Sequence, residues 1–240
     1  DMTVTLDGKE IPFTYDGVSV RADLSVGDGK THRVSVKVKD TSGNVSRTSL
    51  TIEAAGNDGQ PFSDTAGHWS NLFDTYLYNQ GISSGTKKDG QLLYQPNNNI
   101  TRVEFAVLIA KWLNLDTQSY SGVELNFADK AQIPAWAEPY VKVVYGRGLM
   151  NGSMSDGKLM FGPAKNITRQ EAMTVIGHTQ ERGYAEAEMN FSDSGQVASW
   201  ALPYVKTLVA QQVISGSNGK LNPTAYVTRG QVASIIFGLN

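Results

Sequence analysis

The residues best suited to bind a ligand are three arginines, Arg102, Arg169 and Arg229, each of which directly follows a threonine. Each Thr-Arg pair opens an apolar periodic run that predicts a helix. The start of a helix presents backbone N–H groups and carries positive potential. A guanidinium at the first helical position adds a planar pair of donors that matches a carboxylate. The three pairs therefore predict a carboxylate-binding cradle that occurs three times.

The same arginines have a structural alternative, in which they form ion pairs with nearby carboxylates. Three aspartates, Asp64, Asp129 and Asp193, each stand in a recurring Phe-Ser/Ala-Asp sequence. They could pair with the arginines, accept hydrogen bonds from sugar hydroxyls, or cap the entry to a helix. The sequence leaves these roles open.

Each copy of the pattern also has a tryptophan that is followed sixteen residues later by a glycine. The tryptophans are Trp69, Trp136 and Trp200, and the glycines are Gly85, Gly152 and Gly216. An indole could stack on a sugar ring while its N–H donates a hydrogen bond, or it could pack in the core. A glycine lets a ligand approach the backbone amides, or it simply makes a turn.

The spacing of these residues defines a repeat. Thr101 and Thr168 are 67 residues apart, and Thr168 and Thr228 are 60 apart. In each copy the spacing predicts a first helix near the tryptophan, with apolar residues 3, 4, 7 and 8 positions later, and a second helix that begins at the threonine. Glu104, Glu171 and Gln231 follow their threonines by three residues and complete a capping box. One copy has too few apolar residues for its own core, whereas three copies together can bury their apolar faces.

Residues 1–55 alternate in the manner of strands and predict a small antiparallel β domain with one buried face. Residues 56–61 have the composition of a linker. Asp16, Asp28 and Asp40 lie at the turns; turn chemistry is the simpler explanation for them, and a calcium site is the alternative.

The composition excludes several classes of function. The net charge is −2, so the chain has no basic field for nucleic acid or an anionic membrane surface. The chain has no cysteine and only three scattered histidines, so we expect no disulfide, metal site or cofactor. No apolar run is long enough to cross a membrane. Asp1 is not a natural start, so we expect this chain to be a piece of a longer protein.

The repeat resembles the S-layer homology (SLH) domain. The resemblance rests on Phe-x-Asp, the tryptophan, Gly-x-x-x-Gly, Phe161-x-Pro163 and the Thr-Arg-x-Glu box, and it covers about 180 residues. Copy three departs most, because Leu221-x-Pro223 replaces Phe-x-Pro. The expected copies are residues 62–126, 127–190 and 191–240. The start of the chain resembles an immunoglobulin-like sandwich. Such modules are usually longer, and a truncated one would expose an edge strand.

The resemblance implies an all-α, pseudo-threefold trigonal prism with a central helix bundle and three grooves between neighbouring copies. It implies an extracellular protein at the bacterial cell surface that is monomeric through its internal trimer. It also implies noncovalent binding of secondary cell-wall polysaccharide that bears pyruvylated N-acetylmannosamine. The ligand-binding residues would be the arginines, aspartates, tryptophans and glycines named above, and we expect grooves built on the third box to bind less tightly.

We expect no catalysis by this chain. Glycoside hydrolysis needs two carboxylates that face one bond, and the capping boxes already use Glu104 and Glu171. No Ser-His-Asp pattern stands out. The alternatives to anchoring are a structural role in assembling a surface lattice and membership of a glycan-active enzyme attached to the wall.

Overall fold

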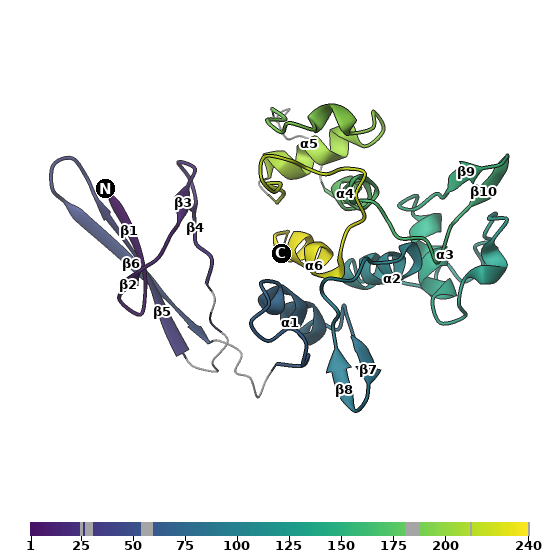
Figure 1. The fold of residues 1–240 in the computed structure, drawn as a ribbon, viewed down its shortest axis with the longest axis horizontal. Helices are drawn as coiled ribbons and strands as arrows, with labels where there is room; N and C mark the ends of the chain where they lie inside the picture. The colour runs from purple at the N-terminus through teal and green to yellow at the C-terminus, as the bar shows by residue number, and fades with distance from the viewer. Residues whose placement is uncertain (25, 27–30, 54–59, 181–187, 212, 240) are drawn as a thin grey trace. The chain divides into compact units, whose positions relative to one another are not determined.

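The alternating residues at the start of the chain form antiparallel strands in the computed structural model (Figure 1). The strands are β1 (Met2–Leu6), β2 (Lys9–Glu10), β3 (Thr14–Tyr15), β4 (Val20–Arg21), β5 (Thr31–Lys39) and β6 (Val45–Glu53). Four of them make one sheet in the order β2-β1-β5-β6, and β3 pairs with β4 in a separate hairpin. The antiparallel sheet is confirmed, whereas a second packed sheet, as in an immunoglobulin-like sandwich, remains a prediction.

The buried face expected for this sheet is much smaller than the alternation suggests. Val4 is buried, but Val38, Val45 and Leu50 are exposed, and Leu50 keeps 64% of its surface. The alternation therefore sets the strands and their register without closing a core among the described residues of this segment.

The predicted turn chemistry is confirmed at two of the three aspartates. The Asp16 carboxylate accepts the backbone N–H groups of Val18 and Ser19. The Asp40 carboxylate accepts hydrogen bonds from Ser42 and Asn44. Asp28 lies outside the described residues, and the described part of the chain has no cluster of three acidic or histidine side chains that could hold a metal.

The structure describes residues 1–24, 26, 31–53, 60–180, 188–211 and 213–239. The chain divides into two compact units. The first unit is Asp1–Leu72 with Lys87–Leu93, and the second unit is Phe73–Thr86 with Tyr94–Asn240. Most of the expected linker lies outside the described residues. None of the described helices is long and apolar enough to cross a membrane.

Each copy of the repeat contains two helices, as predicted, but the region is not all-α. The helices are α1 (Asn71–Asn79), α2 (Arg102–Trp112), α3 (Glu138–Gly146), α4 (Arg169–His178), α5 (Leu202–Ala210) and α6 (Arg229–Phe237), with 3₁₀ helices η2 (Lys130–Gln132) and η3 (Ser194–Gln196). Two-stranded hairpins join the helices of the first two copies, β7 (Thr86–Lys88) with β8 (Gln91–Leu93) and β9 (Ser153–Ser155) with β10 (Lys158–Met160). In copy three, where Pro223 follows Gly216 by seven residues and not eleven, a single bridge between Ser217 and Lys220 replaces the hairpin. The all-α prediction is therefore wrong, because helical periodicity carries no signal for three-residue strands.

The first helix of each copy buries a face that only partly matches the predicted one. Three positions after each tryptophan, Leu72, Pro139 and Pro203 are exposed. Position 8 is buried in every copy, as predicted, at Leu77, Val144 and Leu208. Positions 1 and 5 are also buried, although they were not predicted; in copy two they are Ala137 and Val141. Pro139 occupies the first turn, as expected, where its missing N–H costs nothing.

The second helices form the core of the second unit. Residues 7 and 8 positions after each threonine are buried, as the periodicity predicts; they are Leu108 and Ile109, Val175 and Ile176, and Ile235 and Ile236. Each second helix packs against the first helix of the following copy, α2 against α3 and α4 against α5. The Phe237 ring of α6 lies 5.1 Å from the Phe73 and Tyr76 rings of α1. The last helix therefore contacts the first, and the packing of the copies is cyclic (Figure 1).

Candidate functional site

All three capping boxes are present as predicted. In the first, the Thr101 hydroxyl accepts the Glu104 N–H, and the Glu104 carboxylate accepts the Thr101 N–H at 2.9 Å. The boxes of Thr168 and Thr228 do the same with Glu171 and Gln231. The box thus fixes where each second helix begins and which way its arginine leaves the backbone.

The remaining N–H groups of each helix start are also occupied, which contradicts the predicted anion cradle. The Arg102 N–H donates to the Lys165 carbonyl at 2.8 Å, and the Val103 N–H donates to the Pro163 carbonyl at 3.2 Å. In the other boxes the corresponding backbone N–H groups donate to backbone carbonyls, from Arg169 to Ala225, Gln170 to Pro223, Arg229 to Asn98 and Gly230 to Pro96. Because each acceptor lies in the next copy, the helix starts serve the packing of the copies and have no free donors for a ligand.

The box arginines make a second set of contacts with the next copy. Arg102 Nε donates to the Phe161 carbonyl at 2.7 Å, and Nη1 pairs with the Glu171 carboxylate at 2.7 Å. The Arg102 side chain is only 10% exposed. These contacts agree with the structural alternative, in which the arginines tie neighbouring carboxylates.

The other two arginines repeat this geometry with different partners. Arg169 donates to the Leu221 carbonyl at 2.8 Å and to the Gln231 side-chain oxygen at 3.1 Å. Arg229 donates to the Tyr94 carbonyl at 2.8 Å and lies 3.6 Å from the Glu104 carboxylate. Burial lowers the pKa of Arg169, and the Asp193 charge opposes that shift.

Two of the predicted aspartates are tied to backbone amides. Both oxygens of Asp129 accept N–H groups, from Phe161 and Gly162, each at 2.8 Å. Asp193 accepts the N–H groups of Leu221 and Asn222 in the same way, and these bonds hold its pKa below the usual range. Both carboxylates are buried and do not face a ligand. They tie the first residues of their copy to the residues that follow its hairpin or bridge. Neither caps a helix with its side chain, and Asp64 is exposed.

The predicted glycines differ among themselves. A side chain at Gly152 would meet the Met160 carbonyl at 2.6 Å and the Phe127 ring at 2.7 Å, so this glycine is required by packing. Gly216 has the same surroundings in copy three, against Lys220 and Phe191. Gly85 instead lines a cleft.

The three predicted tryptophans are exposed, which excludes core packing for them. Trp69, Trp136 and Trp200 keep 56%, 58% and 52% of their surface. Each side chain stands just before the first helix of its copy, where an indole face remains open to a ligand.

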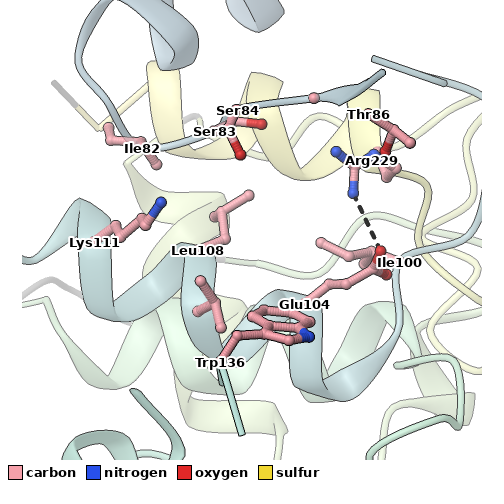
Figure 2. A pocket seen from close by; sticks show the side chains of 12 residues that line it. Ile82, Ser83, Ser84, Thr86, Ile100, Glu104, Leu108, Lys111, Trp136 and Arg229 are labelled. Atoms are coloured by element: carbon pink, nitrogen blue, oxygen red, sulfur yellow. Dashed lines mark ion pairs between the residues drawn. The ribbon is translucent and has the colours of Figure 1, made fainter. Parts of the chain in front are cut away.

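One cleft in the second unit brings together a predicted residue from each copy. Its volume is about 260 Å³, near the lower limit of small-molecule sites at roughly 300 Å³. Figure 2 shows the loop Ile82–Thr86 along one side, α2 along the other and the Trp136 indole beside α2. Gly85, Trp136 and Arg229 are the predicted residues that line it. The other predicted residues do not line this cleft.

The base of the cleft is held by a buried tyrosine. The Arg229 guanidinium lies 4.9 Å from the Tyr94 ring centre, and its Nε bonds to the Tyr94 carbonyl. Burial raises the pKa of Tyr94, the charge of Asp74 raises it further, and a hydrogen bond with Ser83 opposes the shift. Tyr94 therefore stays neutral at physiological pH and fixes the position of Arg229.

Several lining residues were not predicted, among them Ser83, Ser84, Thr86, Leu108 and Lys111. Lys111 could have been found, because it lies seven residues after Glu104 and so on the same face of a helix. The loop residues could not, because only the packing of copy two against α2 makes them part of a cleft.

Comparison with known proteins supports the repeat. The family model described as the S-layer homology domain matches residues 126–173 and 190–233. The match falls on copies two and three, although copy three departs most from the pattern.

Three relatives illustrate the range of similar proteins. The chain is 33% identical over 150 residues to a cellulosome-anchoring protein of Acetivibrio thermocellus, covering 60% of this chain and 32% of that protein. It is 28% identical over 180 residues to the S-layer protein EA1 of Bacillus anthracis, with 74% and 20% covered. It is 28% identical over 214 residues to an amylopullulanase of Thermoanaerobacterium thermosulfurigenes, with 86% and 11% covered.

The chain spans between 11% and 20% of the length of the first four relatives it matches. The similarity therefore covers a region that these long proteins share and not their full length. Residues 126–173 and 190–233 therefore match the S-layer homology domain, and these two regions place the chain at the cell surface.

Proposed function

We propose that the chain anchors noncovalently to the wall by binding secondary cell-wall polysaccharide that bears pyruvylated N-acetylmannosamine. We further propose that residues 62–126 act as a third S-layer homology domain and that the three copies form one pseudo-threefold binding unit. The observation that carries the proposal is the cleft that joins Gly85, Trp136 and Arg229, one residue from each copy.

The chemistry of this cleft suits a sugar that carries an acid group. Trp136 presents an exposed indole face for the apolar side of a sugar ring. Ser84 and Thr86 offer hydroxyls on the opposite side. The Nη2 group of Arg229 has no hydrogen-bond partner among the described residues, so it can donate to a ligand.

Titration calorimetry of the full chain with pyruvylated and non-pyruvylated forms of the glycan tests this proposal. We expect the pyruvylated form to bind more tightly, because only that form carries a carboxylate. Trp136→Ala should abolish binding without unfolding the chain, since the indole is mostly exposed. Equal affinity for the two glycans would refute the carboxylate argument.

We propose, as the role of this region, that it attaches a longer polypeptide and has no catalytic activity itself. The relatives named as an S-layer protein and as an amylopullulanase support this role, because each is similar to the chain over a small part of its length. A fluorescent protein fused to the chain should sediment with purified cell walls, and the Trp136→Ala fusion should stay in solution. Release of reducing sugar ends from wall glycan by the chain alone would contradict the absence of catalysis.

A further inference from the structure

Two cations line the cleft, and they differ in whether their charge is already paired within the protein. Arg229 is 15% exposed, bonds to the Tyr94 carbonyl and pairs with Glu104. Lys111 is half-buried, and its ammonium group makes no hydrogen bond or ion pair with any residue that the structure describes. Its ammonium group points toward the space between Ile82 and Leu108 (Figure 2).

The cleft therefore has a neutralised end and a positive end. Glu104 and Lys111 are seven residues apart on α2, which separates them by about 10 Å at 1.5 Å per residue. Val107 and Leu108 form an apolar wall between them. Two cations and one carboxylate leave the lining with a net charge of +1, and the unpaired charge lies at Lys111.

The position of Lys111 is cationic only in copy one. Counting ten residues from each box threonine gives Lys111, then His178, then Gly238. The His178 ring packs against the Tyr204 ring, with centres 5.4 Å apart. Gly238 has no side chain, so copy three offers nothing at this position.

The loop opposite α2 is also most polar in copy one. Ser83 and Ser84 precede Gly85, whereas Met150 and Asn151 precede Gly152, and Ile214 and Ser215 precede Gly216. Ser83 is buried and bonds to Tyr94, so Ser84 is the serine of this pair that can face a ligand.

We infer that Lys111 binds the carboxylate of an acidic sugar in this cleft and makes the cleft selective for that sugar over its uncharged form. This inference rests on the proposed function. The apolar face of the ring lies against Trp136 and Leu108, and a hydroxyl of the sugar meets Ser84. The box arginine at the other end positions the cleft through Tyr94 and Glu104. The competing role for Lys111 is to complement the carbonyl end of α2.

Calorimetric titration of the full chain with the pyruvylated and the non-pyruvylated glycan tests the inference. Lys111→Gln should weaken binding of the pyruvylated form at least tenfold and leave the other form unchanged. Lys111→Arg should keep most of the affinity, because it retains the charge. His178→Gln, the matched change in copy two, should alter neither affinity, and the melting temperatures of the variants should agree.

The outcomes separate the inference from the proposed function. If the unmodified chain binds neither glycan, the proposed function fails and the inference fails with it. If the unmodified chain prefers the pyruvylated form and Lys111→Gln binds it equally well, only the inference is overturned. An equal loss for both glycans would assign Lys111 to the helix end, and a loss in His178→Gln alone would move the site to copy two; either result overturns the inference.

Discussion

The contact between copies one and two and the contact between copies two and three have the same geometry but different electrostatics. Arg102 meets a carboxylate, Glu171, whereas Arg169 meets the neutral amide of Gln231. The backbone bonds are alike, with Nε at 2.7 and 2.8 Å from a carbonyl of the next copy. The backbone therefore sets the shape of the repeat contact, while the charge is balanced differently in these two contacts.

The largest effect should come from removing the arginine that has a carboxylate partner. Arg102→Ala leaves Glu171 without its cation and the Phe161 carbonyl without a donor. We expect a loss of about 3 kcal/mol in the free energy of unfolding, at the lower end for a broken buried pair because Glu171 is partly exposed. Urea unfolding measures it; a loss no larger than that of Arg169→Ala would remove the distinction.

Arg169→Ala should cost less, since it removes hydrogen bonds to neutral groups only. We expect about 1–2 kcal/mol, the range for bonds whose partners remain partly hydrated. The same urea titration provides the number, with the unchanged chain as reference. A loss above that of Arg102→Ala would show that Asp193, rather than Gln231, is the important partner of Arg169.

Exchanging the two acceptors should make the two contacts more alike in their contribution to stability. Glu171→Gln gives Arg102 the neutral partner that Arg169 has, and we expect a loss of about 1 kcal/mol, the difference between charged and neutral hydrogen bonds. Gln231→Glu should stabilise the chain by a similar amount. Thermal unfolding of both variants checks the two signs, and shifts in the same direction would contradict the electrostatic explanation.

The smallest effect should be a pH dependence at Asp193. The N–H bond from Leu221 lowers the pKa of this carboxyl in the folded state. Its contribution to stability is therefore complete above its unfolded pKa and is lost as the pH falls through the folded value. The urea midpoints of the unchanged chain and Asp193→Asn should converge on acidification below about pH 4, near the ordinary pKa of aspartate. A gap that stays constant down to pH 2 would contradict this assignment.

The sequence predicts the local parts of this fold well. The capping boxes and the buried stripes of α2, α4 and α6 follow from residues within one or two helical turns, and the structure confirms them. The partners of Arg102 and Asp129 lie 59 and 32 residues away at Phe161, so local spacing could not identify them.

The candidate site was predictable only in part, for the same reason. Gly85, Trp136 and Arg229 were recognised as members of a repeat, yet each belongs to a different copy. Helix-start amides were expected to be free because the sequence does not show that the turn after Pro163 approaches Arg102. The missed residue Lys111 has no counterpart in the other copies, so a search for recurrence passes over it.

The hydrogen bonds of the last box link the third copy back to the first. The Arg229 and Gly230 N–H groups reach back to Asn98 and Pro96, so the last copy is completed by the first. A chain with two copies would leave one helix start without acceptors, and a fourth inserted copy would separate these groups. Loss of one copy would therefore remove acceptors that the helix starts of the remaining copies use in this structure.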